Sequence, residues 1–252
     1  MESTNPNTIQ QSESNPKTGA TWNRYKPAYF RRRSKTLCAS PTVLSESSAE
    51  IIARFCWRNL KDDEAVVVLD SLLLGWSIPK LLKLNAEDVH QIQGGFYLRS
   101  PWKFSDPKLS DIWQALLFTS SEYGLVPIPS ALAQRLIKVN SSFDSIEYME
   151  KQVKAYLDVN QKLIGVRPSL SAISRNVKRS ANALGLSRAE LDFISATSQK
   201  DSMQSFYVCF NQEIVHSKLI KYQAQLLDED LEILELKPFC GNFGSKRALT
   251  EA

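Results

Sequence analysis

The stretch EAVVVLDSLLLGWSIPKLLKLNAEDVHQIQGGFYLRS, residues 64–100, contains the change of pattern that decides the fold class. Its first part is apolar at helical spacing and stops at Gly75, a residue type that commonly follows the end of a helix. Pro79 stands near the start of a second, shorter apolar segment, where a helix needs no amide donor. From Gln91 the apolar residues alternate with a period of two, which predicts strands. The stretch therefore predicts helices that lead into a sheet.

The rest of the chain extends this pattern to a mainly α-helical domain. An earlier helix is expected around residues 48–60. Strand patterns occupy residues 91–93, 96–99, 113–119 and 125–128, and Pro127 marks the last of them as an edge strand. Helical spacing follows at about 130–139, 144–163, 169–185, 187–198, 201–210 and 213–229. We expect a mainly α fold with a small three-stranded antiparallel sheet.

Composition excludes several classes of protein. The chain has 252 residues, of which 43% are hydrophobic, which is enough to bury a substantial core. No apolar run reaches about 18 residues and the first residues are polar, so we expect neither membrane insertion nor secretion. The four cysteines lie far apart with no C-x-x-C pair, and the chain has two histidines. We therefore expect a cytoplasmic protein with reduced cysteines, no metal site and no cofactor.

The net positive charge of the chain belongs to its N-terminal segment. Residues 1–36 hold seven cations and two anions, a net charge of +5, whereas the whole chain is +4, so residues 37–252 sum to −1. Because residues 1–45 lack apolar periodicity, we expect a disordered basic arm there. The α-rich domain is then expected to span residues 46–236, with a flexible C-terminal tail at 237–252.

Aromatic and cationic residues alternate within this arm, as in segments that bind nucleic acids. Cations neutralise phosphates and aromatic rings stack on bases, so a DNA-binding arm is expected. Its candidate contacts are Arg24, Lys26, Arg31, Arg32, Arg33 and Lys35, interleaved with Trp22, Tyr25, Tyr29 and Phe30. The alternative is a solvated tail whose aromatic residues dock on the protein's own body.

A second basic surface is expected on the helix at 169–185. Arg175, Lys178 and Arg179 are three or four residues apart and share one face, while Ile173 and Val177 share another. We expect the basic face to contact DNA. Two alternatives remain open: an ordinary amphipathic helix with a solvated face, or a helix–turn–helix over residues 169–198 with Gly185 as its turn.

The order of these elements resembles the catalytic domain of the tyrosine recombinases, the phage-integrase family. The resemblance is carried by LGWSIPKLLKL at residues 74–84, by VPIPSAL at 126–132 and by ALGL at 183–186, and it covers roughly residues 48–229. It implies an integrase-like fold and double-stranded DNA as the partner. It also places Tyr222, in the sequence Ile-Lys-Tyr, where the family has its nucleophile.

The departures from the family pattern concern the charges that catalysis requires. In that family two arginines, a lysine and histidines surround the scissile phosphate and stabilise the transition state. The matching positions here are apolar, neutral or acidic: Ser77, Glu122, Leu191, Ile194 and Glu213. Tyr222 is left without activating neighbours, and an ordinary phenol has a pKa of about 10. Loss of the whole set predicts loss of strand cleavage.

Four functions are compatible with these features. The expected one is a DNA-binding accessory or regulatory protein on a catalytically deficient tyrosine-recombinase-like fold, linked to mobile elements, with a recombinase or another protein as a further partner. The alternatives are a helix–turn–helix transcriptional regulator and an active recombinase that uses Tyr222 with a rebuilt or shared active site. A protein-interaction module whose arm binds an acidic partner is a further rival. No G-x-S-x-G, phosphate loop, G-x-G-x-x-G or H-E-x-x-H motif suggests another enzyme.

Overall fold

The structure is a computed structural model that describes residues 44–100, 123–165, 168–180, 183–196 and 209–244. These residues all belong to one compact unit, Pro41–Ala252. The helices are α2 (Glu46–Arg58), α3 (Asp63–Leu74), α4 (Ile78–Leu81), α6 (Ser130–Ser142), α7 (Ile146–Val159), α8 (Gln161–Ile164), α9 (Leu170–Ser174), α10 (Asn176–Ser180), α11 (Arg188–Ile194), α12 (Gln212–Leu227) and α13 (Leu231–Leu234), with a 3-10 turn at Ala86–Asp88. The strands are β1 (Val89–Ile92), β2 (Gly95–Arg99), β3 (Leu125–Ile128), β4 (Cys209–Asn211) and β5 (Asn242–Gly244). The described part is mainly α-helical, as predicted.

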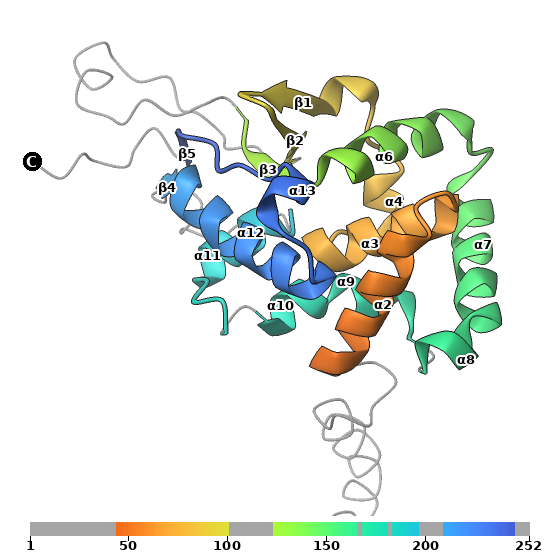
Figure 1. Ribbon diagram of the computed structural model, residues 1–252. Helices are drawn as coiled ribbons and strands as arrows, with labels where there is room; N and C mark the ends of the chain where they lie inside the picture. Colours follow the sequence, from red (N-terminus) through yellow and green to blue (C-terminus); the bar gives the residue numbers. More distant parts are fainter. Residues whose placement is uncertain (1–43, 101–122, 166–167, 181–182, 197–208, 245–252) are drawn as a thin grey trace, which may run out of the picture. The chain divides into compact units, whose positions relative to one another are not determined.

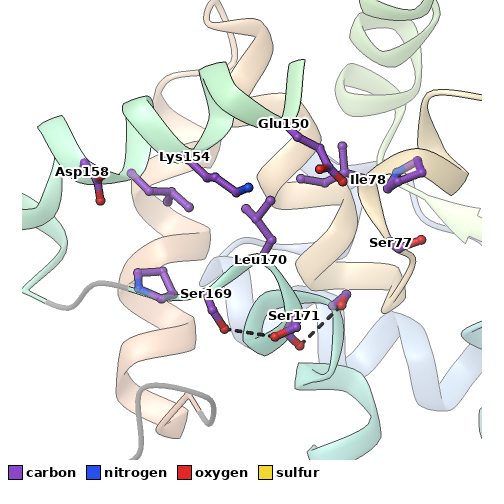
Figure 2. A pocket seen from close by; sticks show the side chains of 12 residues that line it. Ser77, Ile78, Glu150, Lys154, Asp158, Ser169, Leu170 and Ser171 are labelled. Atoms are coloured by element: carbon purple, nitrogen blue, oxygen red, sulfur yellow. Dashed lines mark hydrogen bonds between the residues drawn. The ribbon is translucent and has the colours of Figure 1, made fainter. Parts of the chain in front are cut away.

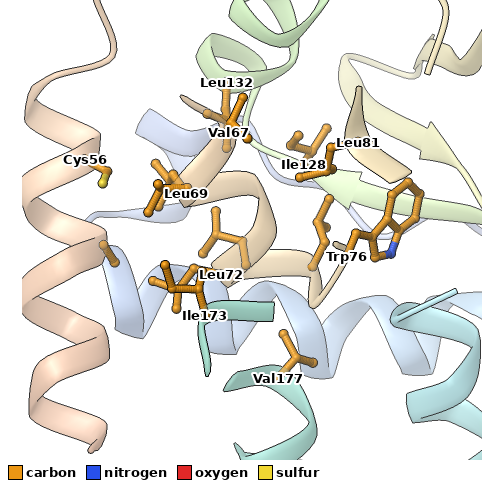
Figure 3. Packing of buried hydrophobic residues seen from close by; sticks show 14 of the residues in the cluster. Cys56, Val67, Leu69, Leu72, Trp76, Leu81, Ile128, Leu132, Ile173 and Val177 are labelled. Carbon is orange, nitrogen blue, oxygen red and sulfur yellow. The ribbon is translucent and has the colours of Figure 1, made fainter. Parts of the chain in front are cut away.

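Helix α3 is the centre of the core. Residues Ala65–Leu74 are all buried, which is the pattern of a helix surrounded by other elements. It packs against α2, α4, α6, α7, α9 and α10 (Figure 1). Figure 3 shows its side chains Leu69 and Leu72 gathered with Cys56 of α2 and Ile173 of α9. The apolar run of residues 65–74 therefore forms the helix against which the other helices pack.

The turn after α3 brings the end of this helix against α9 and α10. Gly75 ends the helix, as predicted, in the left-handed conformation with φ +74°. A Cβ atom at this position would lie 3.2 Å from Cβ of Val177 and 3.3 Å from the carbonyl oxygen of Ser174. Glycine is required here for both the backbone conformation and the close approach.

The first three strands form the expected antiparallel sheet in the order β1-β2-β3. A two-residue turn, Gln93-Gly94, joins β1 to β2, and both residues have positive φ, as a tight hairpin turn requires. Phe96 pairs with Ile128, and Tyr97 pairs with Pro127, so among the described strands β3 lies at the edge, as predicted. The predicted strand at 113–119 lies outside the described residues.

The sequence-based boundaries differ from the structure in the second half of the chain. Residues 209 and 210, predicted as the end of a helix at 201–210, belong to strand β4 (Cys209–Asn211), which pairs with β5 at 242–244. That part of the helix prediction is wrong, because a partner strand about 30 residues away is not visible in the local pattern. Described contacts also continue past residue 236, since Tyr97 Oη donates a 2.9 Å hydrogen bond to the carbonyl oxygen of Lys237. None of the helices in the described ranges has the length and apolar character needed to cross a bilayer.

Candidate nucleic-acid interface

The predicted basic helix at 169–185 is present as two short helices, α9 and α10, separated at Arg175. Ser169 caps the start, because its side chain accepts a 3.2 Å hydrogen bond from the backbone N–H of Ala172. Arg175 ends α9, and the N–H of Arg179 in α10 donates to the carbonyl oxygen of Arg175 at 3.1 Å. Residues 175 and 179 therefore lie one turn apart on the same face.

The two faces of this helix have the expected opposite characters. Ile173, Asn176 and Val177 are buried against the core, whereas Arg175 and Arg179 are exposed. Lys178 is partly buried at the edge of the exposed face. The predicted segregation of basic and apolar residues is confirmed for the described positions, while Asn182 and Ala181 lie outside them.

The two exposed arginines lie on one helix face and, like Arg58 and Arg99 but unlike the other described arginines, have no acidic partner among the described residues. Arg135 forms an ion pair with Asp63 at 2.9 Å, and Arg188 forms one with Asp192 at 3.0 Å. Arg175 and Arg179 form no ion pair within the described part of the chain. Unpaired guanidinium groups on one face are available for the bidentate hydrogen bonds that arginine makes with phosphates.

Lys80 of α4 adds a cation to this region that the sequence analysis did not select. Its ammonium group donates a hydrogen bond to the carbonyl oxygen of Ala196, at the end of α11. Partial burial lowers the pKa of Lys80, and the nearby charge of Lys178 lowers it further. In the sequence, Lys80 stands within an apolar segment, so nothing local indicates the effect of Lys178 on it.

Trp76 fixes the position of α4 relative to the following helices. Its indole Nε1–H donates a 2.5 Å hydrogen bond to the carbonyl oxygen of Ile194, and its own carbonyl oxygen accepts one of 2.7 Å from Ser71 Oγ. The ring is completely buried. These contacts and the close packing at Gly75 hold the turn before α4 against α10 and the end of α11.

A cavity of about 670 Å³ opens next to the basic helix, between α4, α7 and α9. Figure 2 shows Leu170 pointing from α9 toward α7, with Lys154 and Glu150 on the facing helix. Four serine hydroxyl groups also line it, those of Ser77, Ser169, Ser171 and Ser174. The cavity is thus partly apolar and carries charges of both signs.

Tyr222, the candidate nucleophile, lies inside the core rather than on a surface. The side chain is 6% exposed. Its hydroxyl oxygen accepts a 2.6 Å hydrogen bond from Asn176 Nδ2, and the hydroxyl donates at 3.4 Å to the carbonyl oxygen of Leu72. Burial raises the pKa of this phenol well above its ordinary value, although hydrogen bonds from Asn176 and Ser180 oppose the shift. The geometry is that of a tyrosine that joins α12 to α10 and α3.

The immediate surroundings of Tyr222 do not favour an approaching phosphate. A cavity of about 110 Å³ adjoins the ring and is lined by Glu46 and Glu50 among other residues. None of its described lining residues is a lysine or an arginine. A phosphodiester at this position would meet negative charge and no cationic groups from the described residues.

The positions that the family resemblance assigns to catalytic charges hold no cationic side chain where the structure describes them. Ser77 is exposed at the start of α4, and Glu213 is exposed in the first turn of α12. Leu191 and Ile194 are buried in α11. Glu122 lies outside the described residues. The described side chains at these positions provide no cation.

The contacts of the two histidines indicate structural roles. His216 is completely buried, its Nε2–H donates to the carbonyl oxygen of Leu125 at 2.8 Å, and its Nδ1 accepts from the N–H of Phe239 at 3.0 Å. Burial lowers the pKa of His216 to about 4, and the hydrogen bond to Leu125 opposes this shift. The ring of His90 stacks on Tyr123 with 5.3 Å between centroids. With both nitrogens engaged, His216 is not available as a general base.

The remaining candidates are not tested by the structure or are disfavoured by it. The arm residues Arg24, Lys26, Arg31, Arg32, Arg33 and Lys35 lie outside the described residues. Helix α11, the second helix of the helix–turn–helix alternative, is buried from Leu191 to Ile194, which leaves little surface to enter a groove. Within the described ranges, no three His, Cys, Asp or Glu side chains form a group suited to a metal ion.

Comparisons with protein-family models, with curated proteins and with solved structures found no match for this chain. The functional interpretation therefore depends on the geometry of the basic surface and of the groups behind it.

Proposed function

We propose that this protein binds double-stranded DNA through the basic face of α9 and α10, as an accessory or regulatory factor without strand-cleaving activity. The observation that carries this proposal is the pair of exposed arginines, Arg175 and Arg179, with no acidic partner in the described structure. Their helix is anchored by Ile173 and Val177 in the core, so the charges are presented on a fixed element. Phosphate contacts from such a surface supply most of the sequence-independent affinity for DNA.

The tyrosine-recombinase-like fold is part of this proposal. Support comes from the order of the elements, in which an apolar helix, a turn and a short helix precede a three-stranded antiparallel sheet. The Trp76–Ile194 hydrogen bond gives further support, because it joins the turn and the helix where the family places two of its catalytic arginines. A link to mobile elements, and a recombinase as a further partner, follow only from this resemblance.

Burial of Tyr222 favours binding over catalysis within that fold. A nucleophile must reach the phosphorus atom and be deprotonated or activated by a base. Tyr222 is buried, its hydroxyl is engaged by Asn176, and burial raises its pKa. An active recombinase would therefore need a rearrangement that exposes this side chain.

A duplex-binding assay with a charge-matched control tests the proposal. We expect Arg175→Ala with Arg179→Ala to weaken binding to random-sequence duplex DNA at least about 10-fold at low salt, because two phosphate contacts are removed. The control is Arg58→Ala with Lys138→Ala, which removes the same charge from exposed positions on α2 and α6. Both double variants should unfold within about 0.5 kcal/mol of the wild type. Equal loss of affinity in the two variants would contradict a specific role of the α9–α10 face.

A further inference from the structure

The β3 edge of the three-stranded sheet is closed by side chains of α12. The N–H of Leu125 donates to Gln212 Oε1 at 3.0 Å, and its carbonyl oxygen accepts from His216 Nε2 at 2.8 Å. The carbonyl oxygen of Pro127 accepts from Gln223 Nε2 at 3.0 Å, and a proline has no N–H to satisfy. Helix α12 therefore makes the hydrogen bonds that a further strand would make at this edge.

The direction of the backbone groups on β1, at the other edge, follows from the alternation of an antiparallel sheet. The N–H of Ser100 donates to the carbonyl oxygen of Gly124 at 2.8 Å, just past the end of β2, so every second residue of β2 counted back from there bonds to β3. The other residues of β2 bond to β1, where His90 is one of the bonded positions. Val89 and Gln91 alternate with the bonded positions and therefore direct their N–H and C=O groups away from the sheet.

Three of these outward groups have no partner within the described structure. The N–H of Val89 is engaged, because it donates to the carbonyl oxygen of Ala86 and closes the short helical turn before β1. The carbonyl oxygen of Val89 and both backbone groups of Gln91 make no hydrogen bond with the described residues. Gln91 is exposed, and β1 lies on the side of the sheet away from α12 (Figure 1). An edge of this kind can pair with a strand of another chain.

The charges at the two ends of β1 favour a second copy of this chain as the partner. Glu87 and Asp88 stand just before the strand, and Glu87 is exposed. At the other end, the ammonium group of Lys237 donates a 3.3 Å hydrogen bond to the carbonyl oxygen of Gln93 in the hairpin turn. When two β1 strands pair antiparallel, the acidic start of each strand lies beside the Lys237 end of the other. Opposite charges on neighbouring strands stabilise such a pair.

We propose that two copies of this protein pair through β1, antiparallel and about a twofold axis at Gln91, so that their two three-stranded sheets become continuous. Gln91 is placed on the axis because both of its backbone groups are free, whereas the N–H of Val89 is engaged. The N–H of each Gln91 then donates to the carbonyl oxygen of Gln91 in the other copy. The same residues contribute on both sides, as a twofold interface requires. This pairing does not depend on the proposed DNA binding.

Self-association of the full-length protein tests the pairing, by sedimentation velocity at several concentrations without DNA. Each β1 contributes only four residues, so the interface is small and we expect a dissociation constant on the order of 100 µM. Gln91→Pro removes the outward N–H, a group that the bonds between β1 and β2 do not use. It should weaken self-association at least about 10-fold, whereas the matched variant Gln91→Ala keeps the N–H and should dimerise like the wild type. Thermal unfolding checks that both variants retain the fold.

Charged variants test the position of the twofold axis. In the proposed dimer the two side chains at position 91 are directly opposite each other, so Gln91→Lys and Gln91→Glu should each weaken self-association by like-charge repulsion. An equimolar mixture of these two variants should associate again, because opposite charges then meet on the axis. A mixture that associates no better than either variant alone would overturn the register at Gln91.

Two results would overturn the pairing as a whole. Equal dissociation constants for Gln91→Pro and Gln91→Ala would place any interface between copies elsewhere on the protein. A wild type that stays monomeric up to about 500 µM would exclude a second copy as the partner, and would leave the β1 edge to an extended segment of another protein.

Discussion

Replacing Tyr222 with Phe removes one buried hydroxyl group and keeps the volume of the ring. In the wild type, this hydroxyl accepts from Asn176 Nδ2 at 2.6 Å and donates to the carbonyl oxygen of Leu72 at 3.4 Å. Asn176 is 4% exposed, so water cannot easily replace the lost acceptor. A buried donor left without a partner costs about 1–3 kcal/mol, more than the net value of an ordinary hydrogen bond. We therefore expect Tyr222→Phe to lower the free energy of unfolding by about 1–3 kcal/mol.

Urea unfolding of four proteins measures this cost. A double-mutant cycle of the wild type, Tyr222→Phe, Asn176→Leu and the double variant gives the coupling energy of the Asn176–Tyr222 pair. The double variant should recover part of the loss, because neither buried polar group then lacks a partner. A coupling energy near zero would show that the hydrogen bond does not hold α10 to α12.

The same variant separates binding from catalysis. If Tyr222 has a structural role, the variant should bind duplex DNA as tightly as the wild type once both are folded. Neither protein should form a covalent adduct with a nicked suicide substrate, because the phenol is buried and its pKa is raised. A phosphotyrosyl adduct of the wild type that is absent from Tyr222→Phe would refute the reasoning and would require a catalytic cradle from another region or another subunit.

Three further predictions concern titration in the core and the N-terminal arm. Burial lowers the pKa of His216 to about 4, below the ordinary 6.5. The stability contributed by the neutral His216 side chain should therefore be complete above pH 6.5 and should fall by about 3 kcal/mol as the pH drops toward 4. Equilibrium unfolding at several pH values should show this loss of stability in the wild type but not in His216→Gln. Asp70 is completely buried, neither carboxylate oxygen has a hydrogen-bond partner, and burial raises its pKa well above the ordinary value. Above about pH 4, the wild type should therefore lose stability relative to Asp70→Asn by up to about 1.4 kcal/mol per pH unit, until the carboxyl group ionises in the folded state. A constant difference in stability across this range would show that the folded-state pKa of Asp70 is not raised. Deleting residues 1–36, which hold seven cations, should flatten the salt dependence of duplex binding by about 0.9 for each arm–phosphate contact, whereas an unchanged slope would show that the arm does not touch DNA.

Local patterns predicted those parts of the fold that depend on neighbours in the sequence. The end of α3 at Gly75, the strands around 91–99 and 125–128, and the basic face at Arg175 and Arg179 follow from spacing and residue type alone. Each of these features is set within a few residues, so the period of apolar positions is enough to find it.

Features that depend on contacts between distant segments of the chain could not be predicted from the sequence. The pairing of β4 with β5 joins residues 209–211 to 242–244, and the local pattern at 201–210 predicted a helix instead. The hydrogen bond of Lys80 to the carbonyl oxygen of Ala196 joins residues 116 positions apart, and no local pattern indicates it. The burial of Tyr222 likewise depends on Asn176, which lies in a separate helix. Spacing within one element carries no information on which other element will cover it.

The salt dependence of duplex binding by the full-length protein tests DNA recognition by the α9–α10 face most directly. Fluorescence anisotropy with a random-sequence duplex between about 50 and 200 mM salt gives the slope of log K against log salt. We expect a steeply negative slope in the wild type, flattened by about 1.8 when Arg175 and Arg179 are replaced by Ala, since each removes one phosphate contact worth about 0.9. No binding at the lowest salt, or the same slope in both proteins, would contradict DNA recognition by this face.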